Sequence, residues 1–526
     1  MSGCVSGREV GGFSGCPPAL CSGIMANNAY AQLRGLHRQA GTLGSLGSLL
    51  GWDQETYMPH GGAAFRSEQQ GMIAAMAHEK RTSKQVGDLI AECEGDKALL
   101  SDPAVAANIR EMRRDYDLAT KLPGELVAEI ARTTSLAQEA WKLAREKDDF
   151  GAFSPWLEKV LGLMRTKAGL YGGGGELYDA LLDEYEPGMT GAEIGGIFTP
   201  LQGRLSGFVA ELVGSKHQPV DVLAGMDVPN ERQHAFGLEV LRGIGFDLGT
   251  GRLDTTTHPF CSGIGPGDTR LTTRYGTTSC LEPLSSTMHE AGHGLYEQGL
   301  PKGEHFGEPL GDAVSLGVHE SQSRMWENFV GRSRVFWGWA LPVAKRHFGP
   351  VFDGATVEGV YGAVNRVQRS FIRVEADEAT YNLHVMLRFG LERDLVSGAL
   401  AVKDLPGEWD KRFKVLFGLE VPDNRRGCLQ DVHWSCGLIG YFPTYTLGNL
   451  YAGQFWEQIH KDLPGLEGEI ARGEFSSLLG WLRGKVHAHG RRYRAGELCR
   501  LVTGRPLTPE PFMRYLEGKL RPMYKI

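Results

Sequence analysis

Apolar residues recur at spacings of three and four along most of the chain, which is the pattern of amphipathic helices. The pattern is clear in residues 101–146 and 153–171, and it predicts a long helix from about Gly362 to Val396. Between residues 247 and 279 the composition shifts to Thr, Gly and β-forming residues, and the segment Arg270–Tyr275 predicts a short strand among tight turns. We therefore expect a mostly α-helical protein with one small β-sheet.

A single large folded unit is expected from residue 25 to residue 526, behind a leader at residues 1–24. The leader is rich in Gly, Ser, Pro and Cys, shows no periodicity, and lacks the basic start and continuous apolar stretch of a secretory signal. We predict that it is disordered, with Met25 as an alternative initiator. The rest of the chain contains neither an internal repeat nor a charged block that would mark a linker between domains.

Composition limits the classes of partner. The 526 residues include 56 Lys and Arg against 63 Asp and Glu, so the formal net charge is −7, and nothing in this balance favours nucleic acid or an acidic membrane surface. No apolar run approaches the length of about 18 residues that crosses a bilayer. Nine cysteines at scattered spacings, without a CxxC pair, predict neither a disulfide framework nor a cysteine zinc site. A reducing compartment, the cytoplasm, is therefore expected.

The segment His289-Glu290-Ala291-Gly292-His293 carries the candidate chemistry. Residues four apart lie on one face of a helix, so His289 and His293 can present two imidazole nitrogens to one metal ion, with Glu290 beside them. Pro283 suits the first turn of such a helix, and residues 285–287 (Ser-Ser-Thr) offer capping groups. A glycine inside a helix costs about 1 kcal/mol relative to alanine. Its presence at this motif predicts that another backbone or a substrate approaches closely.

A catalytic zinc site needs a third protein ligand. The extended motif HExxHxxGxxH is excluded, because Tyr296 and Gly299 stand where it requires Gly and His. Spacing alone does not choose among the acids that follow, which are Glu297, Glu304, Glu308 and Asp312. Glu320 lies on a second helical stretch, residues 313–326, which could pack against the motif helix and supply a carboxylate; it could equally be a solvated helix acid.

Five further signatures accompany the HExxH motif in a fixed order. They are His258-Pro259-Phe260, the DxRxT pattern Asp268–Thr272, His319–Gln322, Ile372–Asp377 and Gly427–Trp434. With them the chain, from about Tyr30 to its C-terminus, resembles the thermostable metallocarboxypeptidases of the carboxypeptidase Taq family. The resemblance implies a saddle-like, mostly α-helical zinc-peptidase fold with a deep cleft beside a small sheet, formed by residues 25–526, and usually a homodimer.

The resemblance also implies roles for particular residues. His289, His293 and Glu320 become the ligands of one Zn²⁺ per chain, with Co²⁺ as an alternative metal, and Glu290 becomes the general base. The implied reaction removes single residues, with broad specificity, from peptides that have a free C-terminus. The open alternative is an oligopeptidase or dipeptidyl peptidase that uses the same metal site. A catalytically inactive binding scaffold is disfavoured, because the ligands and Glu290 are all present.

Two further groups of residues are candidates for contacts with substrate. His433 and Tyr445 are side-chain donors for an oxyanion, and Tyr441 is a candidate for substrate binding; a packed aromatic core explains all three equally well. A guanidinium fork recognises a free carboxylate best, which points to Arg270 and Arg373. Arg373 has a plainer alternative, an ion pair with Asp377 one helical turn later.

Overall fold

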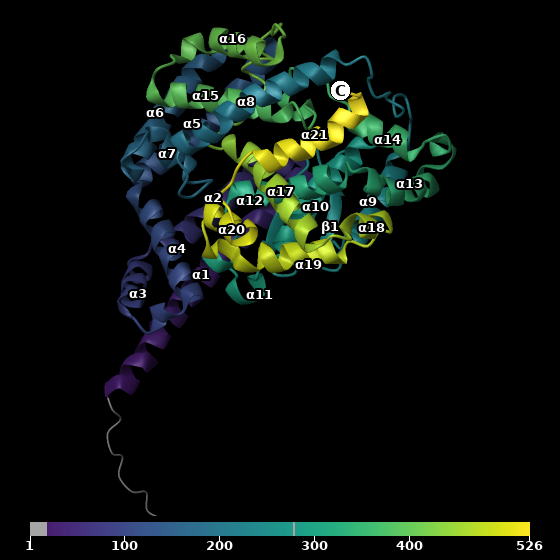
Figure 1. Cartoon of the computed structure of the whole chain (residues 1–526). Coiled ribbons are helices and arrows are strands. Elements are labelled where there is room, and N and C mark those ends of the chain that lie inside the picture. Colours follow the sequence, from purple (N-terminus) through teal and green to yellow (C-terminus); the bar gives the residue numbers. More distant parts are fainter. Residues whose placement is uncertain (1–17, 277–278) are drawn as a thin grey trace, which may run out of the picture.

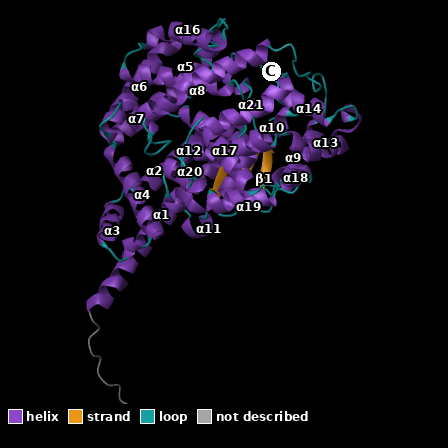
Figure 2. Cartoon of the chain, in the orientation of Figure 1, coloured by secondary structure: helices purple, strands orange, loops and turns teal. Residues whose placement is uncertain are grey.

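The computed structural model describes residues 18–276 and 279–526, and helices make up most of them (Figures 1 and 2). The mostly helical prediction is therefore confirmed. The helices are α1 Pro18–Thr56, α2 Ala63–Arg81, α3 Lys84–Gly95, α4 Pro103–Lys121, α5 Gly124–Lys147, α6 Phe150–Tyr171, α7 Leu177–Leu182, α8 Gly191–Gly214, α9 Asn230–Gly243, α10 Glu282–Gly299, α11 Lys302–His305, α12 Leu316–Arg324, α13 Arg334–Phe348, α14 Val357–Val364, α15 Tyr381–Ser397, α16 Leu405–Phe417, α17 Pro443–Asp462, α18 Leu466–Ala471, α19 Ser476–Lys485, α20 Ala495–Thr503 and α21 Glu510–Tyr524.

Most of the predicted leader, residues 1–17, lies outside the described residues, whereas residues 18–24 belong to the first turns of α1. The division into leader and folded unit stays a prediction. None of the described helices is both long enough and apolar enough to span a membrane.

A three-stranded sheet forms where the change in composition predicted it. Its strands are β1 Gly251–Thr255, β2 Cys261–Gly265 and β3 Asp268–Thr273, in the order β1-β3-β2, with β1 parallel and β2 antiparallel to β3. The sheet packs on α10, since a Cβ atom added to Gly294 would lie 2.8 Å from the side chain of Leu271. On its other flank, a cavity of about 360 Å³ opens between α1, α2 and the edge strand, lined in part by Trp52, Phe260 and Ser262.

The predicted long helix from Gly362 to Val396 is wrong. Helix α14 ends at Val364 and α15 begins at Tyr381, with only a short 3-10 turn, η6 Arg373–Glu375, between them. Asp377 explains the break, because its carboxylate accepts hydrogen bonds from the backbone N–H groups of Gln368, Ala379 and Thr380. A short polar side chain that binds nearby backbone in this way competes with the helix.

The other periodic segments form helices, with one interruption. Residues 153–171 lie within α6, whereas residues 101–146 are divided between α4 and α5. Pro123 precedes α5 in an extended conformation and causes the division, because a proline disfavours helical backbone in the residue before it. Pro283 does lie in the first turn of α10, but that helix starts at Glu282, so Ser285 lies within the helix rather than ahead of it.

Helix α12 lies between α10 and α17, and a glycine permits the close approach on each side. A Cβ atom on Gly292 of α10 would lie 2.5 Å from Cα of Ser323, and one on Gly448 of α17 would lie 2.6 Å from Cγ of Glu320. No real side chain fits at such distances. The predicted reason for a glycine in the HExxH helix is therefore confirmed, and α12 is held by backbone contact between two helices.

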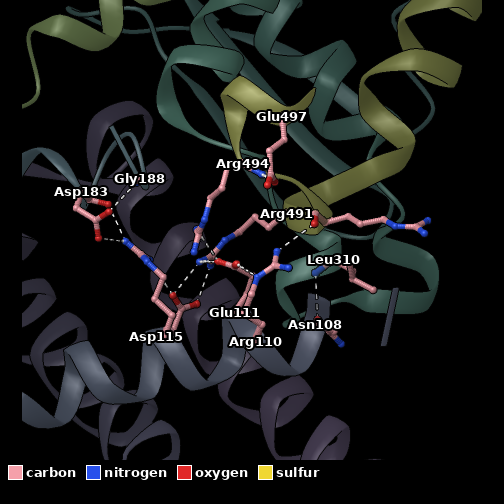
Figure 3. Close-up of polar contacts among 12 residues, drawn as sticks. Asn108, Arg110, Glu111, Asp115, Asp183, Gly188, Leu310, Arg491, Arg494 and Glu497 are labelled. Carbon is pink, nitrogen blue, oxygen red and sulfur yellow. Dashed lines mark hydrogen bonds and ion pairs between the residues drawn. The ribbon is translucent and has the colours of Figure 1, made fainter. Parts of the chain in front are cut away.

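The first helices of the chain are joined to the last ones by a cluster of charges (Figure 3). Glu111 of α4 is 1% exposed and pairs with Arg110, with Arg491 of the 3-10 segment η8 His487–Arg492, and with Arg494. Asp115, one turn further along α4, binds Arg491 through both carboxylate oxygens. Helices α1, α3 and α4 also share a small apolar core of their own, which includes Leu33, Val86, Ile90 and Met112.

Candidate metal centre

Three predicted ligands converge between α10 and α12. His289, His293 and Glu320 each bring one ligand atom to within 4.8 Å of the others. Oε2 of Glu320 lies 3.9 Å from Nε2 of His289 and 3.5 Å from Nε2 of His293. The i,i+4 spacing on α10 supplies the two imidazoles, and the packing of α12 on α10 supplies the carboxylate.

The chemistry of these atoms fits a divalent metal ion. Two imidazole nitrogens and one carboxylate oxygen are the donor set of a catalytic zinc site, which keeps its fourth position open. Burial holds the pKa of His293 well below its usual value, so this ring is neutral and its lone pair is available. Burial alone would lower the pKa of His289 as well, but the carboxylates of Glu320 and Glu327 raise it overall.

Three of the other acids that spacing left open, Glu297, Glu304 and Glu308, have partners elsewhere. Glu297 pairs with Lys302 and with Nε2 of His319. Glu308 pairs with Arg34 and accepts a hydrogen bond from Asn108, and Glu304 lies 3.7 Å from His305. Among the described residues, only Glu320 joins the two histidines in a group that could hold a metal.

Glu290 follows the first histidine and is 7% exposed. Burial raises the pKa of its carboxyl to about 7, with His289 opposing the rise and Glu320 adding to it. A carboxyl group with a pKa near neutrality can both accept and return a proton. The position and the environment of Glu290 therefore suit a general base.

Arg373 lies in a buried cluster of charge, away from the Asp377 partner considered above. Its Nε lies 3.0 Å from Oδ1 of Asp431, and its Nη1 donates to the hydroxyl of Tyr381 at 3.0 Å. Arg388 shares the same carboxylate through Oδ2, at 2.6 Å from its Nε. Two guanidinium groups and one carboxylate leave this cluster with an excess positive charge.

The cluster is linked to the metal candidates through Tyr381. The guanidinium of Arg324 lies over the Tyr381 ring, 4.5 Å from its centroid, and its Nε donates to Oε1 of Glu320 at 2.7 Å. A chain of contacts therefore runs from the buried positive charge at Arg373 to the carboxylate of Glu320.

His433, Tyr441 and Tyr445 form an aromatic group beside this chain. Nε2 of His433 lies 3.2 Å from the hydroxyl of Tyr445, and the rings of Tyr441 and Tyr445 meet edge to face. Burial lowers the pKa of His433 to about 3, so the ring is neutral. Burial chiefly raises the pKa of both phenols, and the negative charge of Glu320 adds to the rise.

Arg270 lies apart from these residues, on β3. Its guanidinium is paired with Asp268 through two hydrogen bonds and stacks on Trp52, 4.3 Å from the ring centroid. Neither of these partners belongs to the group of metal candidates.

Four residues at the site have roles that the sequence did not indicate: Arg324, Glu327, Tyr381 and Asp431. Tyr381 and Asp431 lie in or next to the signatures, but their contacts with Arg373 join separate segments. Glu327 follows α12 on a π-helical turn, η4 Met325–Val330, and accepts a hydrogen bond from Nδ1 of His289 at 2.8 Å. The available signal was spacing: Arg324 and Glu327 follow Glu320 by four and seven residues, which is one helix face.

Comparison with known proteins identifies the family. A model of the carboxypeptidase Taq (M32) metallopeptidases matches residues 32–520. Thermostable carboxypeptidase 1 of Thermus thermophilus is 44% identical over 510 residues, covering 94% of this chain and 99% of that protein. Carboxypeptidase 1 of Bacillus subtilis is 34% identical over 480 residues, covering 91% of this chain and 95% of that protein.

Solved structures agree in fold. The M32 carboxypeptidase from Deinococcus radiodurans has a TM-score of 0.92 at 41% identity, covering 95% of this chain and 100% of that one. Metallocarboxypeptidase 1 of Trypanosoma cruzi has a TM-score of 0.88 at 34% identity, covering 94% of this chain and 99% of that one. With the family model and its relatives spanning nearly all of its length, the chain belongs to the carboxypeptidase Taq (M32) family of metallopeptidases and is a carboxypeptidase.

Proposed function

We propose that this carboxypeptidase is zinc-dependent and releases single amino acids, with broad specificity, from peptides that have a free C-terminus. His289, His293 and Glu320 would hold one Zn²⁺, or Co²⁺, and Glu290 would act as the general base. The observation that carries the proposal is the buried excess of positive charge at Arg373, Arg388 and Asp431, linked by contacts to the Glu320 carboxylate.

That positive charge supports recognition of a C-terminal carboxylate. A buried charge is stable only when it is paired, and Asp431 balances one of the two guanidinium groups. A substrate carboxylate would balance the other. Arg373 is the better placed of the two, because its side chain is 6% exposed while that of Arg388 is fully buried. Arg270 is a weaker candidate, because Asp268 pairs with it alone and already balances its charge.

The chemistry would divide between the metal and the protein. A bound divalent ion supplies an activated water molecule and polarises the scissile carbonyl. Glu290 would accept the proton of that water and return it to the departing amine. Tyr445 would donate a hydrogen bond to the developing oxyanion, with the neutral His433 ring orienting its hydroxyl, and Tyr441 would contact the substrate.

A pair of peptides tests this function. An N-blocked dipeptide and its C-terminal amide are incubated with the enzyme, with and without a chelator. We expect metal-dependent release of the last amino acid from the free acid only. Equal cleavage of the amide would instead support an oligopeptidase.

Glu290→Gln should bind metal and lose turnover, and Arg373→Ala should lose activity on the free acid by a larger factor than Arg270→Ala.

The oligomeric state and the cellular location are also part of the proposal. A homodimer is expected from the family resemblance alone and is tested by light scattering. The proposed cytoplasmic location agrees with six cysteines whose side chains the structure describes as free thiols: Cys93, Cys261, Cys280, Cys428, Cys436 and Cys499.

A further inference from the structure

The carboxylate of Glu327 receives four polar contacts, and each of its oxygens receives two. Oε2 accepts from Nδ1 of His289 at 2.8 Å and from Nη1 of Arg324 at 3.2 Å. Oε1 accepts from Oγ of Ser285 at 3.1 Å and from Nη2 of Arg332 at 3.2 Å. Its side chain is 11% exposed, so these contacts form where water competes little.

One of these contacts decides which nitrogen of His289 is free. A carboxylate that faces Nδ1 requires the hydrogen on that atom, which leaves the lone pair on Nε2. Nε2 is the nitrogen that faces Oε2 of Glu320 and the other histidine. Glu327 therefore selects the tautomer of His289 that can bind a metal and fixes the orientation of its ring.

A second contact connects Glu327 to the proposed ligand on α12. Arg324 bridges Glu327 and Glu320, because its Nε donates to Oε1 of Glu320 at 2.7 Å. This interaction occupies Oε1 and leaves Oε2, the oxygen nearest to both histidines, for a metal. A ligand of α10 and the ligand of α12 are thus joined through two ion pairs, that of Arg324 with Glu327 and that of Arg324 with Glu320.

The local backbone agrees with a specific role for Glu327. The residue lies on the π-helical turn η4, where each turn takes one residue more than in an α-helix. Such turns are frequent at functional sites. Ser285 and His289 lie four residues apart on α10, so both side chains that contact Glu327 from that helix lie on one face.

We propose that Glu327 is a positioning residue of the metal centre: it fixes the tautomer of His289 and, through Arg324, ties that histidine to Glu320, so that two ligands are ordered before a metal ion arrives. The proposal rests on the ligand set proposed above. Residues of this kind typically contribute ten- to a hundredfold to metal affinity.

The test is the Zn²⁺ dissociation constant, measured on the full-length, metal-stripped protein by competition with a chromophoric chelator. Glu327→Gln should weaken Zn²⁺ binding by ten- to a hundredfold. The matched control is Glu378→Gln. Glu378 is a similarly buried carboxylate, paired with Lys519 at 2.6 Å, and Lys519 is not one of the proposed ligands. The control should lower thermal stability and leave the dissociation constant within about twofold of wild type.

The Co²⁺-loaded proteins provide a second readout. The visible absorption bands of Co²⁺ respond to ligand geometry, so they should change in Glu327→Gln and remain unchanged in Glu378→Gln. Arg324→Gln provides a second variant that does not depend on the folding of the first. It breaks the link to Glu320 while Arg332 still pairs with Glu327, and it should weaken Zn²⁺ binding several-fold.

Different results are expected if Glu327 has no positioning role and if the proposed ligands are wrong. Unchanged Zn²⁺ affinity in Glu327→Gln and Arg324→Gln, or equal losses in Glu378→Gln, would overturn the positioning role. His289→Ala tests the ligand set itself: wild-type Zn²⁺ affinity in that variant would refute the proposed site, whereas its loss together with normal binding by Glu327→Gln would refute only the role of Glu327.

Discussion

Tyr441 and Tyr445 belong to the aromatic group beside the buried arginine pair, and their contacts differ. The hydroxyl of Tyr445 meets Nε2 of His433, and its ring lies beside the guanidinium of Arg373, 5.0 Å from Cζ to the centroid. The Tyr441 ring packs edge to face against Tyr185. Of the two hydroxyls, that of Tyr445 is the one in contact with His433, and a fixed hydroxyl suits a preorganised oxyanion donor.

This difference makes a prediction for the two hydroxyl groups. Tyr445→Phe should lower kcat by about 10²- to 10³-fold, the usual effect of removing one oxyanion donor, and leave Zn²⁺ affinity unchanged. Tyr441→Phe should act mainly on KM. Steady-state kinetics on an N-blocked dipeptide distinguishes the two. Equal kcat values for Tyr445→Phe and wild type would remove Tyr445 from the reaction.

The sequence predicted this site as far as its contacts are local. The positions of His289 and His293 follow from one helical turn, and a turn can be inferred from spacing. The pairing of Arg373 with Asp431 joins positions 58 residues apart, and that of His289 with Glu327 joins positions 38 apart. No spacing rule reaches across such distances, so the spacing of the sequence paired Arg373 with Asp377, the acid four residues later.

At the scale of elements, the position of Glu320 depends on how closely α17 approaches α12. The approach leaves no room for a methyl group at Gly448, where a Cβ atom would lie 2.6 Å from Cγ of Glu320 and 2.7 Å from its Cβ. Packing between helices therefore explains the glycines at positions 292 and 448.

Gly448→Ala should therefore displace Glu320. We expect a loss of about 1–3 kcal/mol in the free energy of unfolding, as for other overpacked cores, together with weaker Zn²⁺ binding. Gly480→Ala is the control, because Gly480 is an exposed residue of α19 with no described atom within 4 Å of an added Cβ. Chelator competition and denaturant unfolding measure the two effects. Wild-type Zn²⁺ affinity in Gly448→Ala would show that α12 can shift without cost.

The N-terminus of α12 carries a second prediction, for pH. The fully buried carboxyl of Glu186 accepts a hydrogen bond from the N–H of Gly317 at 3.0 Å, and burial raises its pKa to about 7 from 4.5. Between these values the folded state holds a proton that the unfolded state has lost. The contribution of Glu186 to stability is therefore greatest below pH 4.5, falls as the pH rises towards 7, and stays reduced above it.

Glu186→Gln should remove this part of the pH dependence, which amounts to roughly 3 kcal/mol between pH 4.5 and pH 8. Denaturant unfolding at several pH values measures it in the variant, in wild type and in Glu467→Gln, whose side chain is exposed. Parallel curves for Glu186→Gln and wild type would contradict the raised pKa.

Elements were predicted well where periodicity was the only influence, as in α6. Between α14 and α15 the apolar spacing continued, but the carboxylate of Asp377 bound three backbone N–H groups, and Gln430 accepted the N–H of Arg373. The sequence did contain a signal for a new helix start, namely Asp377, because an Asp whose side chain accepts N–H groups two and three residues later is typical of a helix N-terminus. The Gln430 contact comes from a distant segment and could not have been predicted.

At the scale of the whole molecule, the ion cluster of Figure 3 fastens α4 to η8 and α20. Glu111 pairs with Arg110 at 2.9 Å, with Arg494 at 2.9 Å and with Arg491 at 3.2 Å. Because Glu111 is almost fully buried, the guanidinium groups around it depend on its charge.

Glu111→Gln should lower the free energy of unfolding by about 3–5 kcal/mol, the usual cost of removing one partner from a buried pair. Asp88→Asn is the control. It breaks the pair of Lys84 with Asp88, whose side chains are 88% and 62% exposed, and such a change costs less than about 1 kcal/mol. Denaturant unfolding compares them. Similar losses in both variants would mean that the cluster contributes no more than a surface pair.

The same cluster of charges can form only late in the synthesis of the chain. Arg491 follows Glu111 by 380 residues, so at about 5–20 residues per second the ribosome makes the two partners roughly 20–75 s apart. During that interval α4 has the small core that it shares with α1 and α3, and its contacts with Asp183 and Glu308, but not the arginines of the C-terminal segment. A nascent chain that stalls before η8 leaves Glu111 without the arginines of the C-terminal segment, and the first helices of this enzyme reach their final state only when nearly the last ones emerge.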